Sequence, residues 1–134
     1  MKIALIGYGK MGKAIEELAK ERGDEIVLRI TSSDLGGLTL ENIQKADVAI
    51  DFSRPEFAFE NIALCMHAGV PCVSGTTGWL DKYDDAVDLC NENKGAFLYA
   101  SNFSIGVNLF FNLNKHLATL MQSHNQYDVS MEEI

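Results

Sequence analysis

Residues 2–12 of the chain read KIALIGYGKMG. Lys2 to Ile6 form a short apolar run, which is typical of a parallel strand covered on both faces. After the glycines, apolar residues recur at the spacing of an amphipathic helix, at Met11, Ala14, Ile15, Leu18 and Ala19. Gly23 favours the end of that helix, and residues 25–30 read as a second strand. Strand, helix and strand therefore form one right-handed parallel crossover unit.

The six residues from Gly7 to Gly12 have the G-x-G-x-x-G pattern, which binds dinucleotides when it lies between a strand and a helix. Gly7 permits a tight turn, Gly9 lets a pyrophosphate approach the backbone, and Gly12 lets the helix pack closely on the strand. Free N–H groups at the start of the helix would hold the phosphates. The alternative is a glycine-rich turn without a ligand, but the strand and helix on either side favour binding.

The end of the second strand lacks the acidic residue that usually binds the adenosine ribose of NAD. Hydroxyl side chains stand there instead, at Thr31 and Ser32, and the nearest acid is Asp34. A hydroxyl can bond a ribose or a 2′-phosphate, and no carboxylate repels the phosphate. Unless it is simply a polar turn, this stretch favours NADP or the use of both cofactors.

Strands and helices continue to alternate as far as residue 99. Further strands are expected at residues 48–50, 71–73 and 96–99, while residues 31–44 read as a loop with one short turn. Ser53 and Glu56 have capping-box spacing, with Pro55 between them, and predict a helix that ends at Gly69. The helix after it is expected to bury Leu80, Tyr83, Val87 and Cys90. The alternation predicts the α/β class, with a doubly wound parallel sheet of the Rossmann type.

Three loops should meet at the carboxyl edge of this sheet, beside the nicotinamide half of a bound cofactor. Glycines, hydroxyls and an amide suit a carboxamide, a ribose and a small polar substrate, although each also fits ordinary turn chemistry. The residues concerned are Phe52 and Ser53 after the third strand, Gly75, Thr76 and Thr77 after the fourth, and Ala100, Ser101, Asn102 and Phe103 after the fifth.

The pattern changes beyond residue 100. A helix follows, and the alternation of apolar and polar residues from Tyr127 to Ile134 predicts a strand with one wet face. A single strand cannot form a domain. We therefore expect a dinucleotide-binding domain over residues 1–104, and over residues 105–134 the first helix and strand of a truncated second α/β domain.

Composition excludes several classes of protein. The net charge of −8, from 19 acidic and 11 basic residues, disfavours nucleic-acid binding. The longest apolar runs are too short for a membrane span or a signal peptide, so the cytoplasm is the expected location. The three cysteines show no C-x-x-C spacing and are expected to be buried free thiols. The three histidines lack partners at ligand spacing, and no metal site is expected.

Four motifs in this order resemble dihydrodipicolinate reductase, the 4-hydroxy-tetrahydrodipicolinate reductase family of diaminopimelate and lysine biosynthesis. They are GYGKMG at residues 7–12, DFSRPE at 51–56, VSGTTG at 73–78 and ASNFSIGVN at 100–108. The last two are far more specific than the glycine pattern. The resemblance implies hydride transfer from NADH or NADPH to 4-hydroxy-tetrahydrodipicolinate, giving tetrahydrodipicolinate, in a two-domain enzyme that is usually a homotetramer.

The resemblance also implies a set of site residues. Thr77 would touch the dicarboxylate substrate as well as the cofactor. The cofactor site would comprise Gly7, Tyr8, Gly9, Lys10, Met11, Gly12, Thr31, Ser32, Phe52, Ser53, Gly75, Thr76, Thr77, Ala100, Ser101, Asn102 and Phe103. The catalytic histidine pair and lysine of the family have no counterpart in these residues. No catalytic residue is therefore assigned, and the chain alone is expected to be inactive.

Two other functions fit parts of the sequence. Another small Rossmann reductase would keep the glycine pattern, but it would not predict the motifs at residues 73–78 and 100–108. A non-catalytic module that senses NAD(P) would explain the missing catalytic residues. Against it stands the terminal strand, whose edge a finished module would cover.

Overall fold

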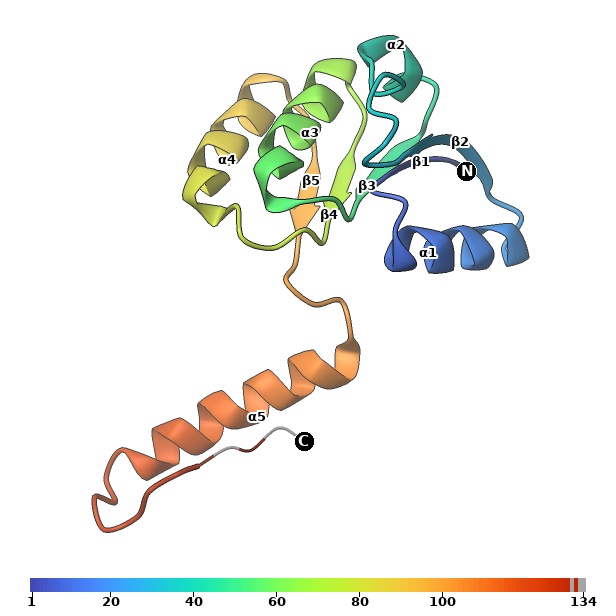
Figure 1. The fold of residues 1–134 in the computed structure, drawn as a ribbon. Coiled ribbons are helices and arrows are strands. Elements are labelled where there is room, and N and C mark those ends of the chain that lie inside the picture. Colours follow the sequence, from blue (N-terminus) through green and yellow to red (C-terminus); the bar gives the residue numbers. More distant parts are fainter. Residues whose placement is uncertain (131, 133–134) are drawn as a thin grey trace. The chain divides into compact units, whose positions relative to one another are not determined.

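The computed structural model describes residues 1–130 and 132. Contacts between residues divide the chain into two compact units, Met1–Ser101 and Asn102–Ile134. The first unit holds the sheet, and the second contains one long helix (Figure 1).

Five parallel strands form the sheet of the first unit, in the order β2-β1-β3-β4-β5. They are β1 (Lys2–Ile6), β2 (Glu25–Ile30), β3 (Val48–Asp51), β4 (Cys72–Ser74) and β5 (Phe97–Tyr99). The predicted parallel α/β sheet is confirmed. Because β2 lies on one side of β1 and β3 on the other, the direction of the strand order reverses at β1. Ligands of such sheets bind outside the carboxyl ends of the strands at this switch point.

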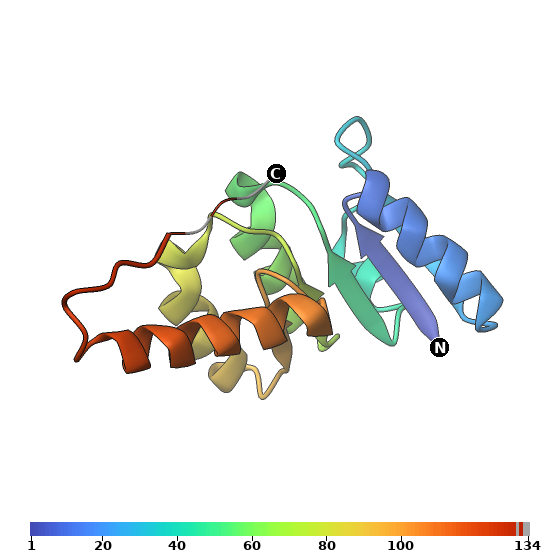
Figure 2. The ribbon, with the colours of Figure 1, turned by 90° about the horizontal axis from the view of Figure 1, so that it is seen from below.

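Helices cover both faces of this sheet, as Figures 1 and 2 show. Helix α1 (Lys10–Glu21) lies on one face, while α2 (Leu40–Ile43), α3 (Pro55–Ala68) and α4 (Tyr83–Glu92) lie on the other. Strand β1 contributes alternately to the two cores. Ile3 and Leu5 pack in the α1 core with Ala19, and Ala4 and Ile6 pack in the larger core on the α3 side. This is why β1 reads as an uninterrupted apolar run.

Helix α3 begins differently from the prediction. Its N-cap is Arg54, with no side-chain hydrogen bond to the first turn, so the capping box of Ser53 and Glu56 is wrong. The Ser53 hydroxyl instead accepts a hydrogen bond from Asn61 Nδ2, 3.0 Å away. Pro55 occupies the first turn, as expected, and Gly69 ends the helix in the left-handed conformation, with φ of +70°.

The segment before α4 also corrects a prediction. Residues Leu80–Lys82 form a short 3-10 turn, η1, before the α-helix starts at Tyr83. This turn points Leu80 away from the core, and Leu80 and Tyr83 are 52% and 38% exposed rather than buried. Trp79 fills the core position instead and is fully buried. The prediction applied one α-helical spacing from Leu80 to Cys90. It was wrong at Leu80 and Tyr83 because the 3-10 turn has fewer residues per turn than the α-helix that follows it.

The cysteines of the first unit are free thiols, as predicted. Cys65 on α3 and Cys72 on β4 are buried in the larger core, and Cys90 on α4 is half-buried against it. Hydrogen bonding to Cys65 and burial raise the pKa of the Cys72 thiol well above its ordinary value. These thiols therefore serve as small apolar core residues.

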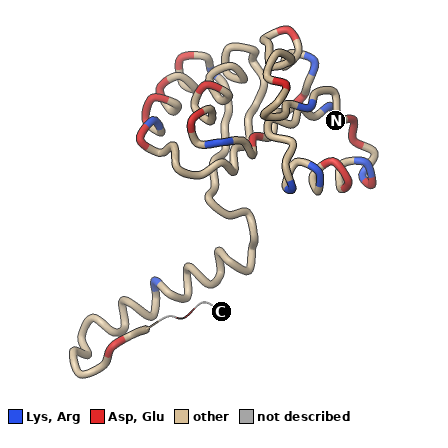
Figure 3. The backbone as a smooth tube through the Cα atoms, in the orientation of Figure 1, with Lys and Arg blue, Asp and Glu red and all other residues tan. Residues whose placement is uncertain are grey.

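The second unit contains helix α5 (Ile105–Met121), whose N-cap Ser104 accepts a hydrogen bond from the N–H of Val107. Among the described residues of this helix none is buried, although it is rich in leucine and phenylalanine. Figure 3 shows few charges on it, and Lys115 is its one Lys, Arg, Asp or Glu residue. No helix in the described part of the chain is long and apolar enough to cross a membrane.

The strand expected over Tyr127 to Ile134 is not found where the structure describes this stretch. Residues 127–130 and 132 have no regular secondary structure, while Met131, Glu133 and Ile134 lie outside the described residues. Alternating sequence alone cannot hold an extended segment, because a strand needs a neighbour to satisfy its backbone groups. None of the described residues of this unit provides one.

Candidate functional site

The candidate site lies at the switch point, where the chain leaves β1 and β3. Gly7 follows β1 and has φ of +93°, a conformation that glycine adopts without strain. A Cβ on Gly7 would collide with the carbonyl oxygen of Phe52, the residue after β3. The N–H of Phe52 donates to the Ile6 carbonyl at 2.9 Å. The two turns are therefore in direct contact, and Gly7 is required for it.

The other two glycines of the pattern differ from each other. A Cβ on Gly12, in the first turn of α1, would collide with the carbonyl oxygen of Gly7, so this glycine serves the turn itself rather than contact with the strand. Gly9 has no such neighbour, since a Cβ there would meet no described atom within 4 Å. Its φ of −86° is open to any residue. Neither steric packing nor φ therefore requires a glycine at position 9, although glycine is among the residues favoured at a helix N-cap, the position that Gly9 holds in α1.

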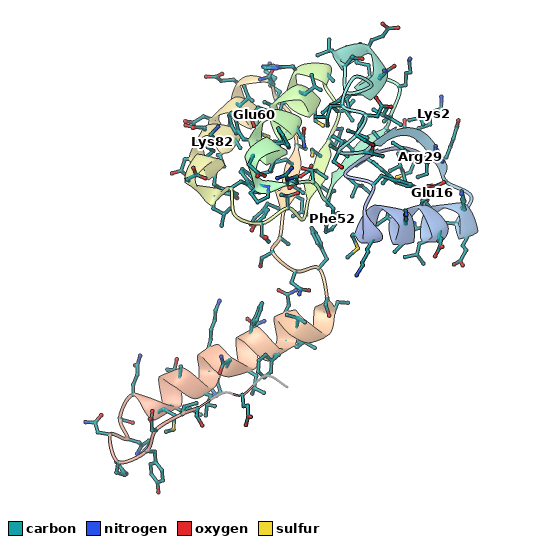
Figure 4. All side chains as sticks on the ribbon, in the orientation of Figure 1. Lys2, Glu16, Arg29, Phe52, Glu60 and Lys82 are labelled. Carbon is teal, nitrogen blue, oxygen red and sulfur yellow. The ribbon has the colours of Figure 1, made fainter. Side chains whose placement is uncertain are left out.

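A network of charged groups fixes the loop on the α1 side. Glu16 faces the sheet from α1 and is buried. Tyr8, from the glycine loop, donates its hydroxyl proton to Glu16 Oε2. Arg29 on β2 donates from Nε at 3.0 Å and from a terminal nitrogen at 2.6 Å, one bond to each carboxylate oxygen (Figure 4). Lys20, one turn further along α1, adds an ion pair at 2.7 Å. The loop, the helix and β2 are thus tied at one carboxylate.

The electrostatics of this network follow from its contacts. Hydrogen bonds from Arg29, then Lys20 and Tyr8, hold the pKa of Glu16 well below its usual range. The same contact acts in the opposite direction on its partners, because Glu16 raises the pKa of the Tyr8 hydroxyl and of the Arg29 guanidinium. Glu16 is therefore ionised and Tyr8 protonated across the ordinary pH range.

A pocket of about 510 Å³ opens beside the glycine loop, within the usual size range of small-molecule sites. It brings together many of the predicted site residues, namely Gly7, Tyr8, Gly9, Thr31, Ser32, Phe52 and Ser53. Sequence reasoning missed further lining residues, from the loop after β2 and from the start of α3. These are Leu35, Leu38, Arg54, Phe57, Glu60 and Asn61.

The predicted ribose position forms a tight turn at the rim of this pocket. The Thr31 hydroxyl accepts a hydrogen bond from the N–H of Asp34 at 3.1 Å and lies 3.0 Å from the Ser33 hydroxyl. Ser32 is exposed and lines the pocket. The Thr31 hydroxyl is thus engaged within the turn, and Ser32 presents the more accessible side chain.

A second polar network lies on the other side of β1, around the carboxylate of Asp51 at the end of β3. Asp51 is completely buried. Asn61 on α3 donates to its Oδ1 at 3.0 Å, while the hydroxyls of Ser74 and Thr76 donate to its Oδ2 at 3.0 and 2.7 Å. Thr76 Oγ1 also accepts from the backbone N–H of Ser53 at 2.8 Å. The network joins the turns after β3 and β4.

The remaining predicted residues lie in different places. Gly75 packs against the Phe52 ring, where a Cβ would collide with the ring carbons, and Thr77 is exposed beside it. Ala100 continues the pairing of β5 with β4 through its N–H, which donates to the Ser74 carbonyl at 3.3 Å. Lys10 and Met11 are exposed at the start of α1. Ser101 ends the first unit, and Asn102 and Phe103 belong to the second, where Asn102 accepts from the N–H of Ser104.

The carboxylates at the centres of the two networks, Glu16 and Asp51, were not predicted as site residues, although the sequence holds a signal for each. Glu16 interrupts the buried face of α1, between Gly12 and Ala19, where an unpaired charge would be unfavourable. Asp51 ends an apolar strand in the same way. A charged residue at a core position requires partners, and this rule points to both networks without naming the partners.

Comparisons with known proteins point to one family. The sequence profile described as "Dihydrodipicolinate reductase, N-terminus" matches residues 1–103. The chain is 51% identical, over its whole length, to a 4-hydroxy-tetrahydrodipicolinate reductase of Christiangramia forsetii, of which it covers 55%. It is 34% identical, over 99% of its length, to the protein of that name from Staphylococcus aureus strain MRSA252, again covering 55%. The chain thus spans about half the length of these relatives.

A solved structure agrees with the sequence comparisons. It is a dipicolinate-bound dihydrodipicolinate reductase from Paenisporosarcina sp. TG-14, which superposes with a TM-score of 0.68 at 28% identity. The match covers 92% of this chain and 54% of that one. With the profile match over residues 1–103, these similarities show that the chain belongs to the dihydrodipicolinate reductase family and corresponds to its N-terminal part.

Proposed function

We propose that the chain binds NADH or NADPH, with the pyrophosphate over Gly9 to Gly12. The observation that carries this proposal is the open space at Gly9, where neither packing nor φ calls for a glycine. A ligand that must come close to the backbone does call for one, because any side chain would occupy the place of its phosphates. The N–H groups at the start of α1 then face the charge of those phosphates.

The two halves of the cofactor occupy opposite sides of the switch point. The adenosine half enters the side of the pocket formed by Thr31, Ser32, Leu35 and Leu38, where Ser32 offers the more accessible hydroxyl, and the nicotinamide half leaves the pocket past Ser53. No carboxylate stands at either hydroxyl position to repel a 2′-phosphate, so the proposal includes NADPH as well as NADH. The nicotinamide half extends toward Gly75, Thr76 and Thr77 and toward Ala100 and Ser101 at the end of β5.

The proposed reaction is hydride transfer to 4-hydroxy-tetrahydrodipicolinate, which yields tetrahydrodipicolinate for diaminopimelate and lysine biosynthesis. Membership of the family supports it, and so does the dicarboxylate bound by the Paenisporosarcina relative. Within this chain the role is cofactor binding, with Thr77 also touching the substrate. We propose that the catalytic histidine pair and lysine of the family have no counterpart among these 134 residues. We also propose that the full-length enzyme acts in the cytoplasm.

Residues 105–134 are proposed to begin a substrate-binding and oligomerisation domain. Helix α5 supports this, since no described residue of its own unit covers Leu109, Phe110, Leu113 or Leu117. Such a helix normally packs against further chain or a second protomer. The family resemblance makes the expected assembly a homotetramer of the full-length enzyme.

Replacement of Gly9 by valine tests cofactor binding directly. We expect Gly9→Val to keep the fold, because its side chain enters open space and the loss of a favoured N-cap residue costs only about 1 kcal/mol. We expect it to bind NADH at least about tenfold more weakly, a difference of 1.4 kcal/mol. The measurement is a fluorescence titration with NADH, with circular dichroism to confirm the fold. Ala14→Val is the matched control, since it adds the same side chain at an exposed position of the same helix. A wild type that binds neither NADH nor NADPH, or a Gly9→Val variant that binds as well as the wild type, overturns the proposal.

A further inference from the structure

Burial of the Asp51 carboxylate is not explained by the stability of the fold alone. Asp51, Ser74, Asn61 and Thr76 are each 4% exposed or less. Removing such groups from water is unfavourable, and apolar residues of similar size often replace buried polar clusters without loss of stability. What a carboxylate provides, and an apolar side chain cannot, is a fixed direction for each donor that faces it.

The direction of the hydrogen bonds at Thr76 shows what is fixed. Its hydroxyl has one proton, which it donates to Asp51 Oδ2 at 2.7 Å. The oxygen is then free to accept the backbone N–H of Ser53 at 2.8 Å. Asn61 uses its two amide protons in the same way, one on Asp51 Oδ1 and one on the Ser53 hydroxyl, each at 3.0 Å. Both the backbone and the side chain of Ser53 are held, through two intermediaries, by one carboxylate.

The turn after β4 is held from its other side as well. The indole N–H of Trp79 donates to the Thr76 carbonyl at 2.8 Å, and the N–H of Gly75 donates to the Asp51 carbonyl at 2.9 Å. The peptide that leads from Thr76 to the exposed Thr77 therefore has little freedom. Ser53, in turn, lines the pocket beside the glycine loop.

We propose that Asp51 is a positioning residue, which acts through Thr76 and Asn61 to hold Ser53 and the 75–77 turn in the conformation that receives the nicotinamide half of the cofactor. This inference rests on the proposed binding of NADH or NADPH. Asp51 affects the binding of the nicotinamide half only. The glycine loop, which receives the phosphates, is held by the separate network around Glu16.

The test compares variants of matched shape on the whole 134-residue chain. Asp51→Asn keeps the size of the side chain, but it replaces one acceptor oxygen by an NH₂ group, so a donor loses its partner. Thr76→Val removes the hydroxyl that links Asp51 to Ser53, while Thr76→Ser restores it. Ile62→Val is the control, since Ile62 is fully buried next to Asn61 and makes no part of the network.

Each variant is titrated with NADH and, separately, with adenosine diphosphate, which has the adenosine and both phosphates but no nicotinamide riboside. Loss of one hydrogen bond to a charged group predicts about tenfold weaker binding of NADH by Asp51→Asn and Thr76→Val. Their affinity for adenosine diphosphate should stay within about twofold of the wild type, a difference of less than 0.5 kcal/mol. Thr76→Ser should recover the NADH affinity lost in Thr76→Val.

Trp79, the one tryptophan of the chain, reports on the turn itself because it bonds to Thr76. Quenching of its fluorescence by acrylamide should increase in Asp51→Asn and Thr76→Val and stay at the wild-type level in Ile62→Val. If Asp51→Asn does not fold, the comparison of Thr76→Val with Thr76→Ser tests whether the network affects NADH binding.

Three outcomes separate the two proposals. A wild type that binds none of NADH, NADPH and adenosine diphosphate overturns the proposed function. A wild type that binds NADH and adenosine diphosphate, together with network variants that bind NADH as well as it does, overturns the role of Asp51. Equal losses for NADH and adenosine diphosphate overturn it too, because they indicate a general loss of structure.

Discussion

Two carboxylates hold the candidate site, one on each side of β1, and they are held in different ways. Glu16 is bound by cations, and its partners Arg29 and Lys20 have side chains 43% and 65% exposed. Asp51 is bound by neutral hydroxyl and amide groups that are themselves buried. A carboxylate near water can be neutralised by flexible charged side chains that reach it from the surface. One deep in the core has to rely on short side chains placed by the fold.

The largest expected effect comes from removing the deeper carboxylate. Asp51→Ala leaves Asn61, Ser74 and Thr76 without their shared acceptor, at about 1–3 kcal/mol for each donor left unsatisfied. We therefore expect the free energy of unfolding in urea to fall by at least about 3 kcal/mol. Glu16→Ala should lower it less, because Arg29 and Lys20 can turn to water, and the exposed neighbour Glu17→Ala serves as its control. A greater loss for Glu16→Ala than for Asp51→Ala would reverse the comparison.

A smaller effect should distinguish the networks by pH. The folded-state pKa of Glu16 lies below its ordinary value of about 4.3, so its contribution to stability is complete above that pH. It is lost as the pH falls below 4.3 toward the folded-state pKa. The difference in unfolding free energy between the wild type and Glu16→Gln should accordingly shrink between pH 7 and pH 3. It should also shrink in high salt, which screens the exposed Arg29 and Lys20. A difference that stays constant under both changes would show that the pairing contributes no charge-dependent stability.

The smallest effect concerns the tyrosine of the glycine loop. The hydrogen bond from Tyr8 to Glu16 raises the pKa of the hydroxyl above its ordinary value of about 10, and the stability from this bond is lost only as the pH rises through that raised value. Subtracting the ultraviolet titration of Tyr8→Phe from that of the wild type isolates this ionisation. We expect its midpoint above pH 10, and nearer to 10 in Glu16→Gln. A midpoint that does not respond to Glu16→Gln would show that the hydroxyl has another partner in solution.

Much of the fold could be predicted because its signals are local. The glycine pattern at residues 7–12, the helix after it and the five strands can each be recognised from residues that are close together in the sequence. The two networks could not be predicted in this way. Glu16 meets Arg29 across 13 residues, and Asp51 meets Ser74 and Thr76 across 23 and 25. Such pairs exist only once the sheet has brought the ends of different strands together.

The wrong predictions have the same origin. Ser53 has the spacing of a helix cap, but it bonds instead to Asn61, two turns along α3, and to Thr76, 23 residues away. The apolar period through Leu80 ignored the 3-10 turn that places Trp79 in the core. Alternation from Tyr127 onward favoured a strand for which the described residues provide no partner. In each case a contact elsewhere in the fold, or its absence among the described residues, outweighed the local pattern.

The open space at Gly9 also bears on how such a chain would evolve. The turn after β1 has no room for a side chain at Gly7 or Gly12. Selection for the fold alone is therefore enough to keep both glycines. Gly9 meets no packing constraint of this kind, and as the N-cap of α1 its position accepts serine, threonine, asparagine or aspartate in a chain that needs only the fold. In a duplicated copy released from dinucleotide binding, position 9 would therefore drift first, while its two neighbouring glycines stayed in place. A glycine that persists at position 9 across descendants is thus a record of continuous selection for the bound cofactor.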